Sequence, residues 1–324
     1  MAVTRRNLVL GAGALALLAA CGDDRRSAAQ SPATAAGGWT FTDDRGRRIQ
    51  LARRPTRIVA QVSAAATLWD FGVRPIAVFG PHRLKDGGKD PEAGDIDVNA
   101  VKSLGNVWDE FNVEQYIALQ PEVLVAGMYV RNELWYVPAK SRDAIEQVAP
   151  TIGIQQEGKA GDELIKRYEE LAVALGGRAD EQARARFRAA EAAFVETVAR
   201  SKRRVMFCAA APEAFYVCEP SKFPDQKYLA AKGLDIVKPD NPDTTGYFEN
   251  LSWENVDKYE ADAVFLDARA QSMKPEEVAK KPTWAKLPAV RAGHVYPWRA
   301  EMRFSYQGYA LLLEELTANL AKLA

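Results

Sequence analysis

The sequence predicts an α/β fold of two lobes joined by one long helix, with a cleft between the lobes. Short apolar runs alternate with helical patterns over residues 57–175, which is typical of a parallel sheet covered by helices. More than twenty residues without Pro or Gly follow, and the alternation then begins again. Two α/β units separated by one uninterrupted helix are the simplest architecture that fits these observations.

The first lobe begins with a predicted hairpin, because "WTFTDDRGRRIQL" alternates apolar and polar residues around a turn at Asp44-Arg45-Gly46. Buried strands and helices then alternate, and each type is recognised by its apolar run or its helical spacing. The expected strands are 57–62, 75–80, 122–127 and 151–154, and the expected helices are 63–73, 112–120, 141–149 and 161–175.

The connecting helix is expected over 181–201, where strong helix formers carry Phe187, Ala190, Phe194 and Val198 at helical spacing. The second lobe repeats the alternation, with expected strands at 204–210, 213–218, 262–268 and 294–298 and helices at 227–234, 255–259 and 306–323. These elements predict two Rossmann-like lobes with central sheets flanked by helices, at residues 39–180 and 202–324.

The first residues have the features of an export signal. Arg5 and Arg6 precede an uncharged run that ends in Leu-Ala-Ala-Cys, and this run is shorter than the ~20 residues of a membrane-spanning helix. The run resembles a bacterial lipobox, which implies a signal peptide at 1–20, a diacylglycerol on Cys21 and a protein held on the outer face of the cell membrane. A plain secretory peptide with an incidental cysteine is the alternative, and the export route, general or twin-arginine, stays open.

Residues 21–38 have the Ser, Ala, Gly and Pro content of a flexible tether. Lys plus Arg and Asp plus Glu both total 43, so no excess charge attracts nucleic acid. The chain has two histidines, His82 and His294, and none of the nucleophile-elbow, P-loop or dinucleotide motifs. An exported two-lobed protein without catalytic groups is expected to bind a ligand in its cleft. A tethered hydrolase and an adhesion module are the alternatives from other classes.

Four segments resemble the substrate-binding proteins of ferric siderophore and cobalamin ABC importers. They are "DDRGRRIQLARRPTRIVA", "SLGNVWDEFNVEQYIALQPEVLVAG", "QVAPTIGI" and "LSWENVDKYEADAVFLDAR", in this order from Trp39 onward. The resemblance implies a monomeric binder, not an enzyme, that captures an iron(III)-siderophore complex outside the membrane. It also implies delivery to a permease with its ATPase. Cobalamin or haem stays open as the ligand.

The resemblance places the ligand on loops that follow strands. Tyr129 falls where hydroxamate-binding relatives use a tyrosine at the iron-coordinating oxygens, which favours a hydroxamate siderophore. Trp108 replaces an arginine that such relatives often carry, so we expect its ring to pack on the siderophore backbone. In the second lobe, Lys222 and Arg269 match cationic contacts and Tyr247 matches an aromatic wall. Arg131, Trp135, Arg299 and Arg303 are further candidates.

The chelate arrives with its metal already bound, so the protein is expected to supply no metal ligand and to need no cofactor. Glu114 and Glu254, one in each lobe, fall where the family uses glutamates to dock on permease arginines. Acidic residues at helix N-termini would explain both positions without any docking role. Cys208 and Cys218 lie on neighbouring predicted strands, where a hairpin disulfide and two buried free thiols are both compatible with the sequence.

Overall fold

The structure is a computed structural model that describes residues 38–269 and 271–323. It begins with the predicted hairpin of β1 (Trp39–Thr42) and β2 (Arg48–Leu51), which pair antiparallel. Asp43 holds the turn, because its carboxylate accepts from the backbone N–H groups of Arg45 and Arg47 at 2.9 and 3.0 Å. The same carboxylate accepts from Gly153 N at 3.0 Å, which fixes the hairpin on the first sheet.

The N-terminal lobe is built on a five-stranded sheet in the order β5-β4-β3-β6-β7, and every neighbouring pair in it is parallel. The residues of β3, β4 and β6 are buried throughout, as strands covered on both faces must be. The strands are β3 (Ile58–Gln61), β4 (Ala77–Phe79), β5 (Lys102–Ser103), β6 (Val123–Met128) and β7 (Thr151–Gln155). The α-helices are α1 (Val62–Asp70), α2 (Val113–Ala118), α3 (Arg142–Val148) and α4 (Gly161–Ala174).

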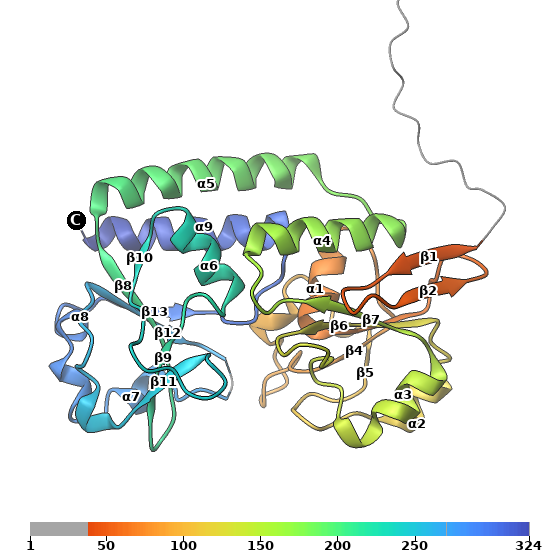
Figure 1. Cartoon of the computed structure of the whole chain (residues 1–324), viewed down its shortest axis with the longest axis horizontal. Helices are drawn as coiled ribbons and strands as arrows, with labels where there is room; N and C mark the ends of the chain where they lie inside the picture. Colours follow the sequence, from red (N-terminus) through yellow and green to blue (C-terminus); the bar gives the residue numbers. More distant parts are fainter. Residues whose placement is uncertain (1–37, 270, 324) are drawn as a thin grey trace, which may run out of the picture. The chain divides into compact units, whose positions relative to one another are not determined.

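Helix α5 (Glu181–Ser201) has the bounds predicted for the connecting helix. Asp180 accepts from Gln182 N at 2.8 Å at its start, and Lys202 ends it in the left-handed conformation with φ 49°. Its predicted apolar residues are buried. Helix α9 (Tyr306–Leu320) runs beside α5, as Figure 1 shows. The division of the chain at 180 and 202 stays a prediction, which the two separate sheets support.

The C-terminal lobe has a mixed sheet in the order β11-β9-β8-β12-β13, with β10 beside β8. The strands β8, β12, β13 and β10 are parallel, whereas β9 and β11 are antiparallel to their neighbours. The strands are β8 (Arg204–Ala210), β9 (Phe215–Cys218), β10 (Asp235–Ile236), β11 (Phe248–Leu251), β12 (Ala263–Asp267) and β13 (Val295–Trp298). The α-helices besides α9 are α6 (Pro224–Ala231), α7 (Pro275–Val278) and α8 (Pro288–Arg291).

The structure decides two expectations for this lobe, one about a helix and one about its two cysteines. The helix expected over 255–259 is wrong, because only a 3₁₀ turn at Trp253–Asn255 forms there. Cys208 and Cys218 are free and buried. Cys208 lies opposite Val217 in the strand pair, so Cys218 points to the other face of the sheet and packs in a different apolar cluster. This register explains why no hairpin disulfide forms.

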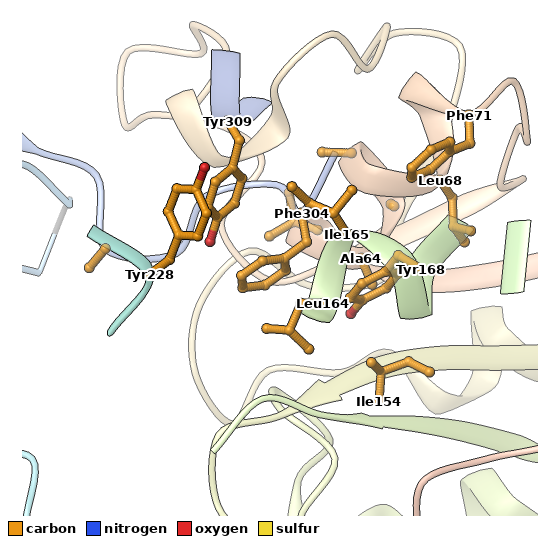
Figure 2. Packing of buried hydrophobic residues seen from close by; sticks show 14 of the residues in the cluster. Ala64, Leu68, Phe71, Ile154, Leu164, Ile165, Tyr168, Tyr228, Phe304 and Tyr309 are labelled. Carbon is orange, nitrogen blue, oxygen red and sulfur yellow. The ribbon is translucent and has the colours of Figure 1, made fainter. Parts of the chain in front are cut away.

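The chain returns to the N-terminal lobe between β13 and α9. Arg303 Nη1 lies 2.9 Å from Asp70 Oδ1 at the end of α1, and Phe304 N donates to Thr67 Oγ1 at 2.9 Å. The Phe304 ring stacks on Tyr168 of α4 with a centroid distance of 5.9 Å, and Figure 2 shows this packing. The return segment, residues 299–305, therefore ties the lobes together in addition to α5, and it carries residue 301 into the space between them.

Candidate functional site

The candidate site lies between the two lobes, and the side that the N-terminal lobe contributes is aromatic. Tyr129 directly follows β6, at the carboxyl edge of a parallel sheet, where ligands of α/β proteins usually bind. Its side chain is almost completely buried, and its hydroxyl has no hydrogen-bond partner among the described residues. The Trp135 ring packs on it with a centroid distance of 5.1 Å. Burial raises the pKa of Tyr129 well above its ordinary value, so this phenol keeps its proton and is a donor without an acceptor.

The C-terminal wall holds Arg269, two residues after β12. Its Nη2 lies 2.8 Å from Asp267 Oδ2, and its Nη1 lies 2.5 Å from Glu301 Oε1. Burial alone would lower the pKa of Arg269, but the Glu301 and Asp267 carboxylates raise it well above the ordinary value. Arg269 is therefore a permanent cation whose single charge is more than balanced by two neighbouring carboxylates.

Glu92, on the 3₁₀ turn Pro91–Ala93 of the N-terminal lobe, is a further acid near Arg269. One of its carboxyl oxygens, Oε2, is buried without a partner among the described residues. Burial raises the pKa of Glu92 well above its ordinary value, and the charge of Glu301 raises it further. Glu92 is therefore biased toward its neutral form, and it forms no ion pair with Arg269 within the described chain.

Three side-chain contacts cross from one lobe to the other beside this site. Trp135 Nε1 donates to Glu301 Oε2 at 3.0 Å, and the Tyr247 hydroxyl donates to the backbone oxygen of Tyr129. Lys222 Nζ lies 3.0 Å from Glu157 Oε1. The two walls therefore face each other across a narrow cleft.

This cleft contains a cavity of about 450 Å³, within the usual size range of small-molecule sites. Its lining is mostly aromatic and apolar, with one arginine and two carboxylates. The residues that line it are Tyr129, Val130, Trp135, Glu157, Phe223, Thr245, Tyr247, Phe248, Arg269, Ala300 and Glu301. Of the predicted site residues, the structure brings Tyr129, Trp135, Tyr247 and Arg269 together here.

A second, more polar cavity of about 530 Å³ adjoins the first through Glu157, which lines both. The predicted residues Arg131 and Lys222 lie in this second cavity, and Asp44 and Gln155 also line it. The Lys222 Nζ atom lies 5.6 Å from the Tyr247 ring centroid, so this cation stands at the border between the two cavities. Lys222 and Arg131, which were predicted to contact the ligand, therefore lie beside the aromatic cavity and not inside it.

Three further predicted ligand residues line neither of these two cavities. Trp108 is 57% exposed and packs edge-on against Trp135, with a centroid distance of 4.7 Å, so it supports the aromatic wall from outside. Arg299 is exposed and bonds Glu315 on α9 at 2.6 Å. Arg303 is committed to two aspartates of the N-terminal lobe. Both contacts use its Nη1 atom and fasten the return segment to the N-terminal lobe.

The sequence analysis missed Glu157, Phe223, Phe248 and Glu301 as cavity residues. Phe223 has a visible signal, because it lies in the loop "EPSKFPD" beside the predicted Lys222. Glu301 has none, because an acid between a strand and a helix is usually solvated. Among the described residues, no group of three or more His, Cys, Asp or Glu side chains is arranged to hold a metal ion.

The two predicted docking residues are exposed and belong to different lobes. Glu114 lies in the first turn of α2, and Glu254 lies in the 3₁₀ turn that follows β11. Hydrogen bonds from its own backbone N–H and from Ser252 lower the pKa of Glu254, so this side chain is a surface anion. Cys21, the predicted lipidation site, lies outside the described residues. None of the described helices is long and apolar enough to span a membrane.

Comparison with solved structures gives DesE, a ferric-siderophore receptor protein from Streptomyces coelicolor, at 38% identity and a TM-score of 0.83. The match covers 87% of this chain and 97% of DesE. The siderophore periplasmic binding protein from the fuscachelin gene cluster of Thermobifida fusca matches at 22% identity and a TM-score of 0.61, over 83% of this chain and 97% of that one. This second likeness concerns the fold.

Among curated proteins, the Fe(3+)-citrate-binding protein YfmC of Bacillus subtilis (strain 168) is 21% identical over 256 residues. The match covers 78% of this chain and 76% of YfmC. The family model for periplasmic binding proteins matches residues 68–302, which include strands β4 to β13 and every residue that lines the aromatic cavity. The chain therefore belongs to the periplasmic binding proteins, a family whose members bind a substrate for ABC importers and do not transform it.

Proposed function

We propose that this protein captures a ferric siderophore of the hydroxamate type in its aromatic cleft and delivers it to the permease of an ABC importer. The relatives support iron chelates as the ligand class, since DesE is a ferric-siderophore receptor and YfmC binds ferric citrate. The cavity supports a preassembled chelate, because its aromatic lining can cover organic arms while a few polar groups orient the metal-bound oxygens.

The observation that favours hydroxamates is that the cation of the aromatic cavity and the cation at its border are already paired. Arg269 is bonded to Asp267 and Glu301, and Lys222 is bonded to Glu157. Three hydroxamates balance the three charges of ferric iron, whereas three catecholates leave a trianion. Because a buried anion needs unpaired cations or many donors, this cleft suits the uncharged complex.

Tyr129 is the residue that we propose to contact the chelate. Its hydroxyl is a buried donor without an acceptor in the described structure, and such a donor costs free energy unless a ligand supplies the missing partner. A hydroxamate oxygen on iron would be such an acceptor. The rings of Trp135, Tyr247 and Phe223 line the same cavity and would cover the arms of the siderophore.

Haem and cobalamin remain the alternative ligands of this proposal. Haem is held by an axial side chain, often a histidine. His82 is buried and its Nδ1 is bonded to Gly80 O, while His294 Nδ1 is bonded to Asp262 O, and neither lines the cavity. Tyr129 is therefore the candidate axial ligand of the described cavity, which makes haem a direct competitor in the binding test.

Delivery requires a surface that the permease can recognise. Glu114 and Glu254 are exposed anions, one on each lobe, and we propose that they pair with permease arginines. Attachment to the outer face of the membrane through Cys21, and a monomeric state, complete the proposal. Both remain predictions from the sequence.

The test is a titration of the purified protein with a ferric trihydroxamate, a ferric triscatecholate, ferric citrate, haem and cobalamin. Quenching of tryptophan fluorescence reports binding, because Trp135 lies in the cavity wall. We expect the ferric trihydroxamate to bind most tightly and to be recovered unchanged. Tighter binding of any other ligand, or chemical conversion of the chelate, would contradict the proposed function.

A further inference from the structure

Glu301 is a buried carboxylate in the return segment, where it forms part of the wall between the aromatic cavity and a third cavity of about 310 Å³. It is 4% exposed. Neither its loop position nor its residue type would place it in a binding site, because buried glutamates are rare unless they are paired. Its position follows from the attachment of the neighbouring Arg303 and Phe304 to the N-terminal lobe.

The two oxygens of this carboxylate bond to different lobes. Oε1 accepts from Arg269 Nη1 at 2.5 Å, and Oε2 accepts from Trp135 Nε1 at 3.0 Å. Asp267 engages the Nε and Nη2 atoms of the same guanidinium. Since a guanidinium has five N–H groups, the Arg269 guanidinium retains N–H groups that can face the cavity.

We propose that Glu301 is the specificity-determining residue of the cleft, because it makes the cluster of Arg269, Asp267 and Glu301 net negative toward a ligand. The inference rests on the proposed function. With Glu301 and Asp267 both in contact, the arginine offers hydrogen bonds to chelate oxygens but no net attraction for an anion. Without Glu301, the remaining Arg269–Asp267 pair is neutral, so a triscatecholate is no longer repelled, while an uncharged trihydroxamate is nearly unaffected.

The low exposure of Arg269, Asp267 and Glu301 strengthens the influence of the Glu301 charge on a bound ligand. The side chains of Arg269, Asp267 and Glu301 are 16%, 2% and 4% exposed, so solvent and salt screen their charges weakly. Glu92 does not replace Glu301 in this role, because burial raises its pKa and favours its neutral form. The loss of one carboxylate charge therefore changes the field in the cavity directly.

The substitution Glu301→Gln tests this role while it keeps the size of the side chain and an oxygen that can accept from Trp135. Dissociation constants for a ferric trihydroxamate and a ferric triscatecholate are measured by tryptophan fluorescence, at one pH and one ionic strength. We expect the preference for the trihydroxamate to fall at least tenfold, mostly through tighter binding of the trianion.

Glu314→Gln is the matched control. Glu314 is an exposed glutamate on α9 that bonds Arg186 of α5 and lines none of the cavities described above. The control removes the same charge from the protein, so we expect the preference between the two chelates to stay within twofold of the original protein. An equal change in both variants would overturn the assignment to Glu301.

An unchanged preference in folded Glu301→Gln would also overturn it. If that variant does not fold, Asp267→Asn removes the other partner of Arg269 and is expected to shift the preference in the same direction. The proposed function fails separately, when the original protein does not bind the ferric trihydroxamate. A protein that binds it while both variants keep the original preference refutes only the role of Glu301.

Discussion

Arg269 and Arg303 are two arginines in similar surroundings with different tasks. The side chain of Arg269 is 16% exposed and that of Arg303 is 10% exposed, and each contacts two carboxylates. Arg269 bonds partners of its own lobe and of the return segment, and it lines the aromatic cavity. Arg303 bonds Asp70 and Asp95 of the opposite lobe, so its contacts fasten the two lobes to each other.

The difference indicates that the origin of the partners separates an arginine that lines the cavity from one that fastens the lobes. Both residues lie in loops beyond strands of the second sheet, so chain position does not distinguish them. A buried ion pair between lobes fixes their relative position, whereas a pair at the edge of a cavity sets the charge that a ligand meets. The comparison predicts that the two arginines respond differently to substitution.

The largest effect is expected for Arg303→Met, which keeps the bulk of the side chain and removes its charge. Asp70, whose side chain is 2% exposed, would lose its cation, and breaking a buried pair costs about 3–5 kcal/mol. Urea unfolding measures this loss of stability. We expect the affinity for the ferric trihydroxamate to stay within twofold. A large loss of affinity in a protein of normal stability would place Arg303 in the binding site instead.

The next effect concerns the pH dependence of the free energy of unfolding, which we expect Asp70, the partner of Arg303, to cause. Burial raises the pKa of Asp70 from 3.8 to about 6, although Arg303 and Ser305 partly oppose the shift. The folded protein therefore holds this proton up to a higher pH than the unfolded chain does. The stability that comes from this proton is complete below pH 4 and is lost as the pH rises to about 6, by roughly 3 kcal/mol.

Asp70→Asn isolates this contribution, because asparagine does not titrate and Arg303 keeps Asp95 at 2.7 Å. The free energy of unfolding is measured in urea at several pH values between 4 and 7 for both proteins. We expect the difference, original protein minus variant, to decrease as the pH rises through this range. A difference that is constant with pH would show that Asp70 does not hold a proton in the folded state.

The sequence predicts the sheets and the connecting helix well, because local periodicity encodes them. Ile58–Gln61 and Val123–Met128 are apolar runs that only a covered strand explains, and 181–201 lacks any helix breaker. Tyr129 could be placed in advance, since it follows such a strand. The helix expected at 255–259 fails because three-dimensional packing, and not local preference, decides short segments.

The charged part of the site could not be predicted, because its contacts join distant parts of the chain. Glu301 meets Trp135 across 166 positions, and Arg303 meets Asp70 across 233. No local pattern encodes such pairs. The sequence therefore identified the cations of the second lobe, but not which of them would be neutralised in the cleft and which would fasten the lobes.

The smallest expected effect concerns the wall opposite Arg269, where Tyr129 has a buried hydroxyl without a partner in the described structure. Tyr116 provides a matched control, because it is fully buried in the same lobe and its hydroxyl also has no described partner, but it does not line the cavity. Removing either hydroxyl should leave the free energy of unfolding unchanged or raise it by about 1 kcal/mol. Only the hydroxyl of Tyr129 should matter for the ligand.

The affinity of Tyr129→Phe for a ferric trihydroxamate, measured beside that of Tyr116→Phe, tests the central claim most directly. The account predicts that Tyr129→Phe binds about 5 to 30 times more weakly than the original protein, equivalent to one hydrogen bond of about 1–2 kcal/mol. Tyr116→Phe should bind as the original protein does. Unchanged affinity in Tyr129→Phe, or an equal loss in both variants, would contradict the account.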